Sequence, residues 1–267
     1  MTRRHFAVSA LAAGFVKAET SQERGKKIID RAIAALGGGN FLAMQDRVES
    51  GRAYSFYRER LSGLSIAKIY TRYVAAPQPP TPGFFGIQER ESFGKKKEES
   101  AILFTDGNGY ELTYRGVRPL ADNLVERYKE STLHNIFYIL RQRLGEPGLQ
   151  FESKGQDVVE NRPVETIDVF DAQNRSVTVY LDSDTFLPMK QRFYRRDPAT
   201  KDRIEEISRF SKYRDAGNGV MWPLDLQRDR DSEKIFEMYA DSVTVGDHLK
   251  DSLFLLPSGM KILRKES

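Results

Sequence analysis

The chain has 267 residues, of which 39% are apolar and 30% are charged, and it contains no cysteine. This composition suits a globular protein, and the lack of cysteine excludes disulfide bonds and a cysteine nucleophile. The formal net charge of +4 comes mainly from residues 1–18, which hold Arg3, Arg4 and Lys17 and no acid. The remaining chain is close to neutral, so we expect no nucleic-acid partner, which would need a surplus of Lys and Arg on one face.

Residues 1–18 have the pattern of an export signal. Arg3 and Arg4 give a positive start, and Phe6–Val16 is a short apolar run that ends in small residues. We expect a signal peptide over 1–18 and one periplasmic domain over 19–267; the alternative is an apolar N-terminal helix. The arginine pair also resembles a twin-arginine signal, so both the general secretory and the twin-arginine export routes remain open.

The first half of the mature chain is predicted to open with a helix and continue as antiparallel strands. Gln22–Leu36 has one apolar face, a candidate N-cap in Ser21 and three glycines at its end, as expected for a helix that covers a sheet. Alternating apolar and polar residues predict strands, and the strands pair as hairpins across Gly- and Asn-containing turns. These strands are Met44–Arg60, Leu64–Val74, Ile87–Lys97, Glu98–Thr105 and Tyr110–Tyr114.

A proline-rich stretch interrupts these strands. Four prolines lie between Pro77 and Pro82, and Phe84 and Phe85 follow them. Proline removes backbone donors and fixes an extended geometry, so this stretch is predicted to be an exposed loop at the sheet rim. The two phenylalanines have two interpretations: they anchor the loop on the core, or they form a mobile apolar lip over a cavity.

Pro119–Leu144 is predicted to be a helical lid across the sheet. Leu133, Ile136, Phe137 and Leu140 repeat at spacings of three and four residues, which places them on one face. His134 lies in the same region without a metal-ligand or nucleophile partner in the sequence pattern, so we expect a packed or surface histidine.

The second half is predicted to be an antiparallel meander. It centres on a hairpin whose turn is Ser183-Asp184-Thr185, because short polar side chains bond their own backbone in turns. Asp251–Pro257 is expected to dock on a helix or sheet edge through Leu253, Phe254, Leu255 and Leu256. The sequence therefore predicts an α+β fold with one broad, strongly curved antiparallel sheet. The strands of the meander are Gln150–Val159, Val164–Phe170, Ser176–Leu181, Leu187–Arg196, Ile204–Tyr213, Val220–Arg228 and Ile235–Val245.

Sequence patterns typical of catalysis are absent. The chain has no Gly-x-Ser-x-Gly elbow, no His-Glu-x-x-His and no glycine-rich phosphate loop before a helix. Paired acids such as Asp182 with Asp184 lie in strands and turns, where they are mostly solvated. Asp106 and Asn108 lack the downstream acids of a calcium loop. We therefore expect neither an enzyme nor a metal site nor a cofactor.

Four short sequence stretches along the mature chain together resemble a known family. They are Ala35 to Gly38 at the end of the first helix, Val179 to Lys190 with its Leu-Asp-x-x-Thr-x-Leu-Pro pattern, Trp222-Pro223, and Leu253 to Pro257. In this order and spacing the chain resembles the LolA/LolB-like outer-membrane lipoprotein-sorting proteins. The resemblance covers nearly all of the mature chain, although the chain is longer than a typical carrier and has no position that matches the carriers' lid-closing arginine.

The resemblance implies an unclosed β-barrel whose open side is covered by helices and encloses an apolar cavity for acyl chains. It implies a monomeric periplasmic carrier that moves the acyl chains of lipoproteins, or another lipid, toward the outer membrane, with an inner-membrane donor and an outer-membrane acceptor as partners. A curved sheet too wide for its own side chains to fill agrees with such a cavity.

Ten apolar residues are candidates for the wall of this cavity. Their alternate or helical spacing fits ordinary core residues equally well. The candidates are Phe56, Tyr70, Met189, Phe193, Leu224, Leu226 and Met238 from the strands, and Ile136, Phe137 and Leu140 from the helical lid.

Two other functions remain open. One is a non-catalytic protein-interaction or sensory module of the same fold, with a filled core and an exposed patch around Phe84 and Phe85. The other is a hydrolase, which would need a polar cleft that the sequence does not indicate.

Overall fold

The computed structural model describes residues 18–75, 85–95, 98–197 and 199–265. The predicted export signal up to residue 17, the proline-rich stretch and Phe84 lie outside the described residues. Within the described part, no helix is long and apolar enough to cross a bilayer.

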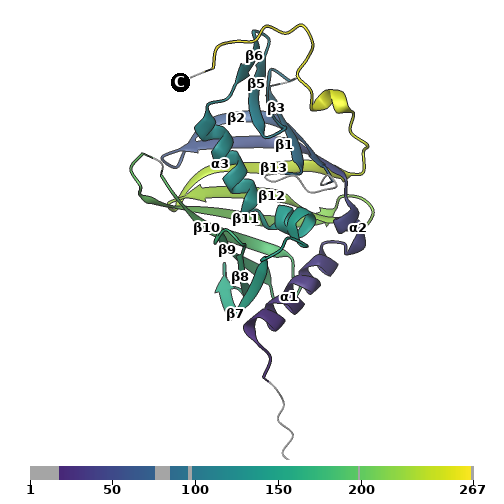
Figure 1. The fold of residues 1–267 in the computed structure, drawn as a ribbon, viewed down its shortest axis with the longest axis vertical. Coiled ribbons are helices and arrows are strands. Elements are labelled where there is room, and N and C mark those ends of the chain that lie inside the picture. The colour runs from purple at the N-terminus through teal and green to yellow at the C-terminus, as the bar shows by residue number, and fades with distance from the viewer. Residues whose placement is uncertain (1–17, 76–84, 96–97, 198, 266–267) are drawn as a thin grey trace, which may run out of the picture.

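Thirteen antiparallel strands form one sheet in the order β6-β5-β4-β3-β2-β1-β13-β12-β11-β10-β9-β8-β7 (Figure 1). The first and last strands, β1 and β13, pair at the centre, while β6 and β7 lie at opposite edges, so the barrel does not close. The strands are Asp46–Tyr57 (β1), Arg60–Tyr73 (β2), Ile87–Gly94 (β3), Ser100–Thr105 (β4), Asn108–Thr113 (β5), Gly116–Pro119 (β6), Gln150–Val159 (β7), Arg162–Phe170 (β8), Ser176–Asp182 (β9), Pro188–Arg196 (β10), Arg203–Asp215 (β11), Met221–Arg230 (β12) and Glu233–Val245 (β13).

Helix α1 (Ser21–Ala35) forms as its sequence predicts, with one correction. The N-cap is Thr20 rather than Ser21: the Thr20 hydroxyl accepts from the Glu23 amide at 3.1 Å, and the Glu23 carboxylate accepts from the Thr20 amide at 2.8 Å. The helix ends at glycines, where Gly37 and Gly38 take φ values of 119° and 58°. Its apolar face packs across β7 to β9.

The predicted helical lid is divided into two parts. Helix α3 (Asp122–Leu133) ends before Asn135, whose side chain accepts from two backbone amides and starts the short helix α4 (Ile136–Tyr138). A π-helical turn, Ile139–Arg143, continues α4. In Figure 1, α3 crosses in front of the central strands, whereas α4 lies beside α2 (Gly39–Ala43) and the end of α1.

The C-terminal segment covers the opposite, convex face of β2 to β6. It contains the 3₁₀ turn Asp251–Leu253, and the next residue, Phe254, is 1% exposed against Leu103, Leu112 and Val117. Leu255 and Leu256 remain exposed. The predicted docking of this segment is therefore confirmed for Phe254 and wrong for the two leucines that follow it.

Candidate functional site

The concave face of the sheet has a densely filled half beneath α1, α2 and α4. Phe137 packs edge-on against Phe210, with ring centroids 4.9 Å apart, and lies 4.6 Å from Trp222. Ile136 and Leu140 are completely buried in the same cluster. Side chains of the protein fill this half, so Ile136, Phe137 and Leu140 serve as core that fixes α4 to the sheet.

The other half of the concave face lies beneath α3 and is packed more loosely. Val125 is the buried residue of this twelve-residue helix, and Leu124 is 40% exposed. Figure 1 shows α3 crossing the central strands diagonally. A helix with one fully buried residue is held by few apolar contacts, because apolar burial supplies most of the stability of helix docking.

The sheet beneath α3 presents an apolar floor that water still reaches. The centre of the floor consists mostly of small residues: Gly51 of β1 lies opposite Ala67, and Ala53 lies opposite Met238. Glycine is required at position 51, because a Cβ there would stand 1.9 Å from the Tyr239 carbonyl oxygen. Larger side chains surround this centre and are half-buried. They are Ile69, Phe93, Leu226 and Phe236. We call this floor, together with the underside of α3, the α3 groove.

A chain of polar contacts runs along one side of the α3 groove. Arg47 is buried over the Trp222 ring, 4.0 Å from its centroid, and donates to Glu49, the Tyr73 hydroxyl and the Thr71 hydroxyl at 2.7, 2.9 and 3.0 Å. Burial disfavours the charged guanidinium, but Glu49 and its other neighbours outweigh that effect and raise the pKa of Arg47. Thr71 in turn donates to Glu89 at 3.1 Å.

Glu91 stands next to Glu89 on the floor of the groove. Burial, and secondly the charge of Glu89, raise the pKa of Glu91 to about 8, although Arg228 opposes the shift. Glu91 therefore keeps its proton at neutral pH. Tyr128 of α3 lies above these acids, and its hydroxyl is buried without a hydrogen-bond partner among the described residues. Burial, followed by Glu89 and Glu91, raises the pKa of Tyr128 well above its ordinary value.

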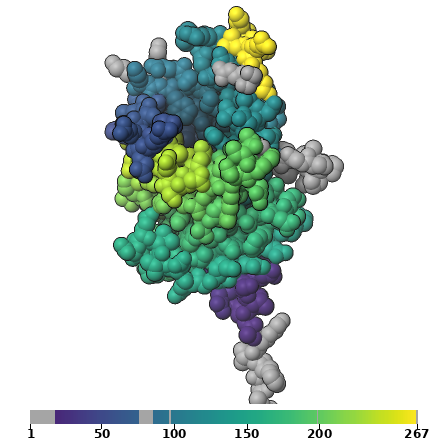
Figure 2. All heavy atoms as spheres, turned by 90° about the vertical axis from the view of Figure 1, so that its left-hand side faces the viewer, coloured from purple at the N-terminus to yellow at the C-terminus, as the bar shows by residue number. Residues whose placement is uncertain are grey.

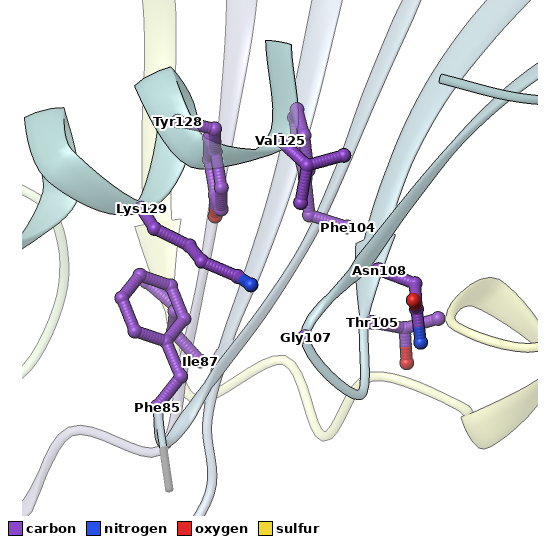
Figure 3. A pocket seen from close by; sticks show the side chains of 9 residues that line it. All are labelled: Phe85, Ile87, Phe104, Thr105, Gly107, Asn108, Val125, Tyr128 and Lys129. Atoms are coloured by element: carbon purple, nitrogen blue, oxygen red, sulfur yellow. The ribbon is translucent and has the colours of Figure 1, made fainter. Parts of the chain in front are cut away.

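A small pocket opens at the β4–β5 end of the groove (Figure 3). Tyr128 stacks face to face on Phe104 of β4, with centroids 3.5 Å apart, and Phe85 packs against Tyr128 and Tyr138 at 6.0 and 5.5 Å. The pocket holds about 210 Å³ of empty space, including open solvent at its mouth. The part that a water-sized sphere can enter is only about 10 Å³, far below the roughly 300–1,000 Å³ typical of ligand pockets, so a ligand could enter only if the side chains around the pocket moved.

The contacts of Phe85 also bear on the rim loop. The Tyr138 hydroxyl donates to the Phe85 carbonyl, and the Phe85 ring packs against Tyr128 of α3 and Tyr138 of α4. These contacts fit the interpretation in which loop aromatics anchor the loop on the core.

The structure brings most of the predicted wall residues to the concave face, but not all. Phe193 is buried and stacks on His134 at 4.2 Å, which confirms a packed histidine. Leu226 lies opposite Met238 in the groove floor, and Leu224 is half-buried beside them.

The remaining three residues lie elsewhere. Tyr70 packs on the convex face in the Phe254 cluster. Phe56 is close to the tip of the β1–β2 hairpin, with the Lys234 ammonium 5.2 Å from its ring. Met189 is half-buried where the register of β10 and β9 shifts.

Sequence reasoning missed the polar part of the groove. Glu89, Glu91 and Phe93 alternate with Gln88, Arg90 and Ser92, so both faces of β3 look polar and alternation does not identify the inner one. Only the pairing of Thr71 with Glu89, and of Ile69 with Glu91, places these acids on the concave face. Among the described residues, no group of three or more His, Cys, Asp or Glu is placed to hold a metal ion.

Comparisons with known proteins address the fold. No family model matches the chain, and no curated protein matches it. Among solved structures, a domain described as that of an outer membrane lipoprotein-sorting protein from Vibrio parahaemolyticus aligns with a TM-score of 0.57 at 11% identity, over 87% of this chain and 97% of that chain.

Two further structures agree. A DUF1329 family protein from Desulfovibrio piger aligns with a TM-score of 0.57 at 12% identity, over 86% of this chain and 97% of that chain. A LolA superfamily protein from Nitrosomonas europaea aligns with a TM-score of 0.53 at 11% identity, over 89% of this chain and 98% of that chain. These likenesses confirm the fold that the sequence resemblance implied: the chain has the curved, unclosed antiparallel sheet of LolA-like proteins.

Proposed function

We propose that this protein is a carrier that holds an acyl chain, of a lipid or of a lipidated protein, in the α3 groove. One observation carries the proposal: apolar side chains of the central sheet remain half-exposed beneath a helix that buries little of its own surface. Protein interiors are normally close-packed, so an apolar surface left partly exposed beneath a helix suggests that a ligand covers it.

The groove fits a ligand that binds and is later released. The small buried residues Gly51, Ala53 and Ala67 keep the centre of the floor low, and the half-buried side chains around them offer apolar contact. Each methylene removed from water contributes about 0.8 kcal/mol, so about six methylenes would give roughly 5 kcal/mol. That free energy is enough for capture and small enough for transfer to a partner.

The fold supports the same role. Structures described as a lipoprotein-sorting domain and as a LolA superfamily protein share this sheet. The export signal predicted over residues 1–18 would place the carrier in the periplasm, between an inner-membrane donor and an outer-membrane acceptor. The polar side of the groove is bonded within itself from Arg47 to Glu89, which favours binding over catalysis.

A titration with a fluorescent fatty-acid probe tests the proposal. We expect saturable binding by the wild type and a loss of affinity of about tenfold or more in Leu226→Asp, because the substitution places a carboxylate on the apolar floor. Val158→Asp is the matched control, since Val158 is 65% exposed on the β7–β8 hairpin, far along the sheet from the groove. Equal binding by both folded variants would contradict the assignment of the groove.

A second candidate is a protein-interaction or sensory module without a lipid ligand. The densely filled half of the concave face favours it, because Ile136, Phe137 and Leu140 leave no space there. The same titration separates the two, since this candidate predicts no saturable uptake of the probe by the wild type.

A further inference from the structure

The β1–β2 hairpin extends beyond the strand beside it. Strand β3 pairs with β2 only from Ile66 to Tyr73, so residues 60–65 of β2 have no strand partner on that side among the residues that the structure describes. Figure 2 views the molecule from the side of the hairpin tip, and the dark-blue segment stands out from the surface there. The hairpin is therefore an exposed projection of the sheet.

Large apolar side chains gather on this projection. Tyr57, Leu61, Leu64 and Ile66 are 66%, 58%, 55% and 52% exposed. Exposed apolar residues are ordinary when they are scattered singly, but four within ten residues of one hairpin form a patch, and such patches mark interaction sites. On the convex face, Leu64 lies opposite Tyr54, whose ring packs on Tyr239 at 6.0 Å and extends the patch toward β13.

Basic side chains surround the patch. Arg52, Arg58, Arg60 and Lys68 are all exposed, and Glu59 is the only acid between residues 52 and 68. None of the four forms an ion pair in the part of the chain that the structure describes. Arg58 and Glu59 make the turn with φ values of 49° and 60°, so a two-residue turn of non-glycine residues carries these charges to the tip.

We propose that the β1–β2 hairpin docks on the anionic surface of a lipid bilayer. Apolar side chains of an exposed element enter the boundary between headgroups and acyl chains, while Lys and Arg bind anionic headgroups. A second copy of the chain fits the patch less well, because a symmetric contact would bring the same unpaired arginines against each other.

Docking would have a geometric consequence. Ala53 and Ala67 of the groove floor lie on the same two strands as the patch, so the bilayer would meet the sheet at one end of the α3 groove. Docking itself needs only the hairpin. Acyl-chain binding in the groove and membrane binding by the hairpin can each fail without the other.

Vesicle flotation tests the docking. The chain should begin at Glu19, because the apolar run Phe6–Val16 would itself enter lipid, and every described helix and strand lies at or after Ser21. We expect the wild type to float with phosphatidylcholine vesicles that contain phosphatidylglycerol, and to bind vesicles of phosphatidylcholine alone or at high salt about tenfold more weakly.

Two double variants separate the apolar and the charged parts of the patch. Leu61→Ser with Leu64→Ser should weaken binding about tenfold or more, and Arg58→Gln with Arg60→Gln should weaken it while removing most of the salt dependence. Val158→Ser, on another hairpin, should bind like the wild type. These side chains are exposed, so we expect thermal unfolding to show intact folds.

Two results would overturn the proposal. One is the absence of the predicted binding pattern: either the wild type fails to bind the anionic vesicles, or both double variants bind them as well as the wild type does. The other is a wild-type dimer that the leucine variant dissociates, without any vesicle binding, which would assign the patch to a second copy of the chain.

Discussion

Glu91 makes the polar side of the groove measurable through pH. It lies on β3 opposite Ile69, and burial together with the neighbouring Glu89 raises its pKa from 4.5 to about 8. A raised carboxyl pKa means that the folded chain binds this proton more tightly than the unfolded chain does. The free energy of unfolding therefore falls as the pH rises from about 4.5 to about 8.

The size of the fall follows from the two pKa values. At about 1.36 kcal/mol for each pH unit, the displacement from 4.5 to about 8 sets an upper bound of roughly 5 kcal/mol. Glu91 is only half-buried and shares its site with Glu89, so solvent screening reduces the expected effect to about 2 kcal/mol. Replacement by glutamine keeps the group neutral at every pH and removes this contribution.

Urea unfolding at about pH 5 and about pH 8 measures the contribution of the Glu91 proton to the free energy of unfolding. Between these two conditions the wild type should lose about 2 kcal/mol of unfolding free energy relative to Glu91→Gln. Titrating groups far from the groove cancel in the difference between the two proteins, which therefore reports the Glu89–Glu91 pair. Glu233→Gln, at an exposed position on β13, should follow the wild type at both pH values. Parallel pH dependence of wild type and Glu91→Gln would refute the assignment of a proton to the groove floor.

Two further predictions concern packing. Arg47→Met should lower the free energy of unfolding by about 3 kcal/mol, because it leaves Glu49 partly buried without its cation. The control Arg52→Met, on the exposed face, should change that free energy by less than about 0.5 kcal/mol. Equal effects of the two substitutions in chemical denaturation would contradict the Arg47 network. Gly25→Ala should lower the free energy of unfolding by about 2 kcal/mol although alanine favours helices, since the added Cβ would lie 2.3 Å from the Phe151 carbonyl oxygen. The control Gly39→Ala, where the Cβ would meet open space, should leave the stability unchanged or raise it. A Gly25→Ala protein more stable than the wild type would show that α1 does not lie this closely on β7.

Much of the fold follows from local chemistry. The apolar stripe and terminal glycines of α1, and the turn residues between strands, act within a few positions of each other, so the sequence reveals them. The hairpin turn predicted over Asp106–Gly109 forms at Asp106 and Gly107, with Asn108 and Gly109 already in β5, and the hairpin at Ser183 to Thr185 appears where the sequence predicts it. The four-residue strand β6 was missed because its pairing is set by β5 and by the distant C-terminal segment.

The site depends on distant contacts that no local pattern shows. The predicted lid breaks at Asn135, whose side chain caps the new helix, and the Ile136 amide donates to Gln191 of β10. Alternation placed Tyr70 with the wall residues, but it could not tell the concave face from a convex face that the C-terminal segment also buries. Leu226 and Met238 lie on the same face because β12 and β13 pair directly.

The central claim is that the α3 groove holds an acyl chain. Native mass spectrometry of the protein isolated from the cells that produce it, followed by lipid extraction, tests it most directly. We expect a near-stoichiometric mass of a lipid or lipidated protein on the wild type and a much smaller share on Leu226→Asp. A clean mass of the protein alone, together with no uptake of added fatty acid, would contradict the carrier proposal and favour the interaction module.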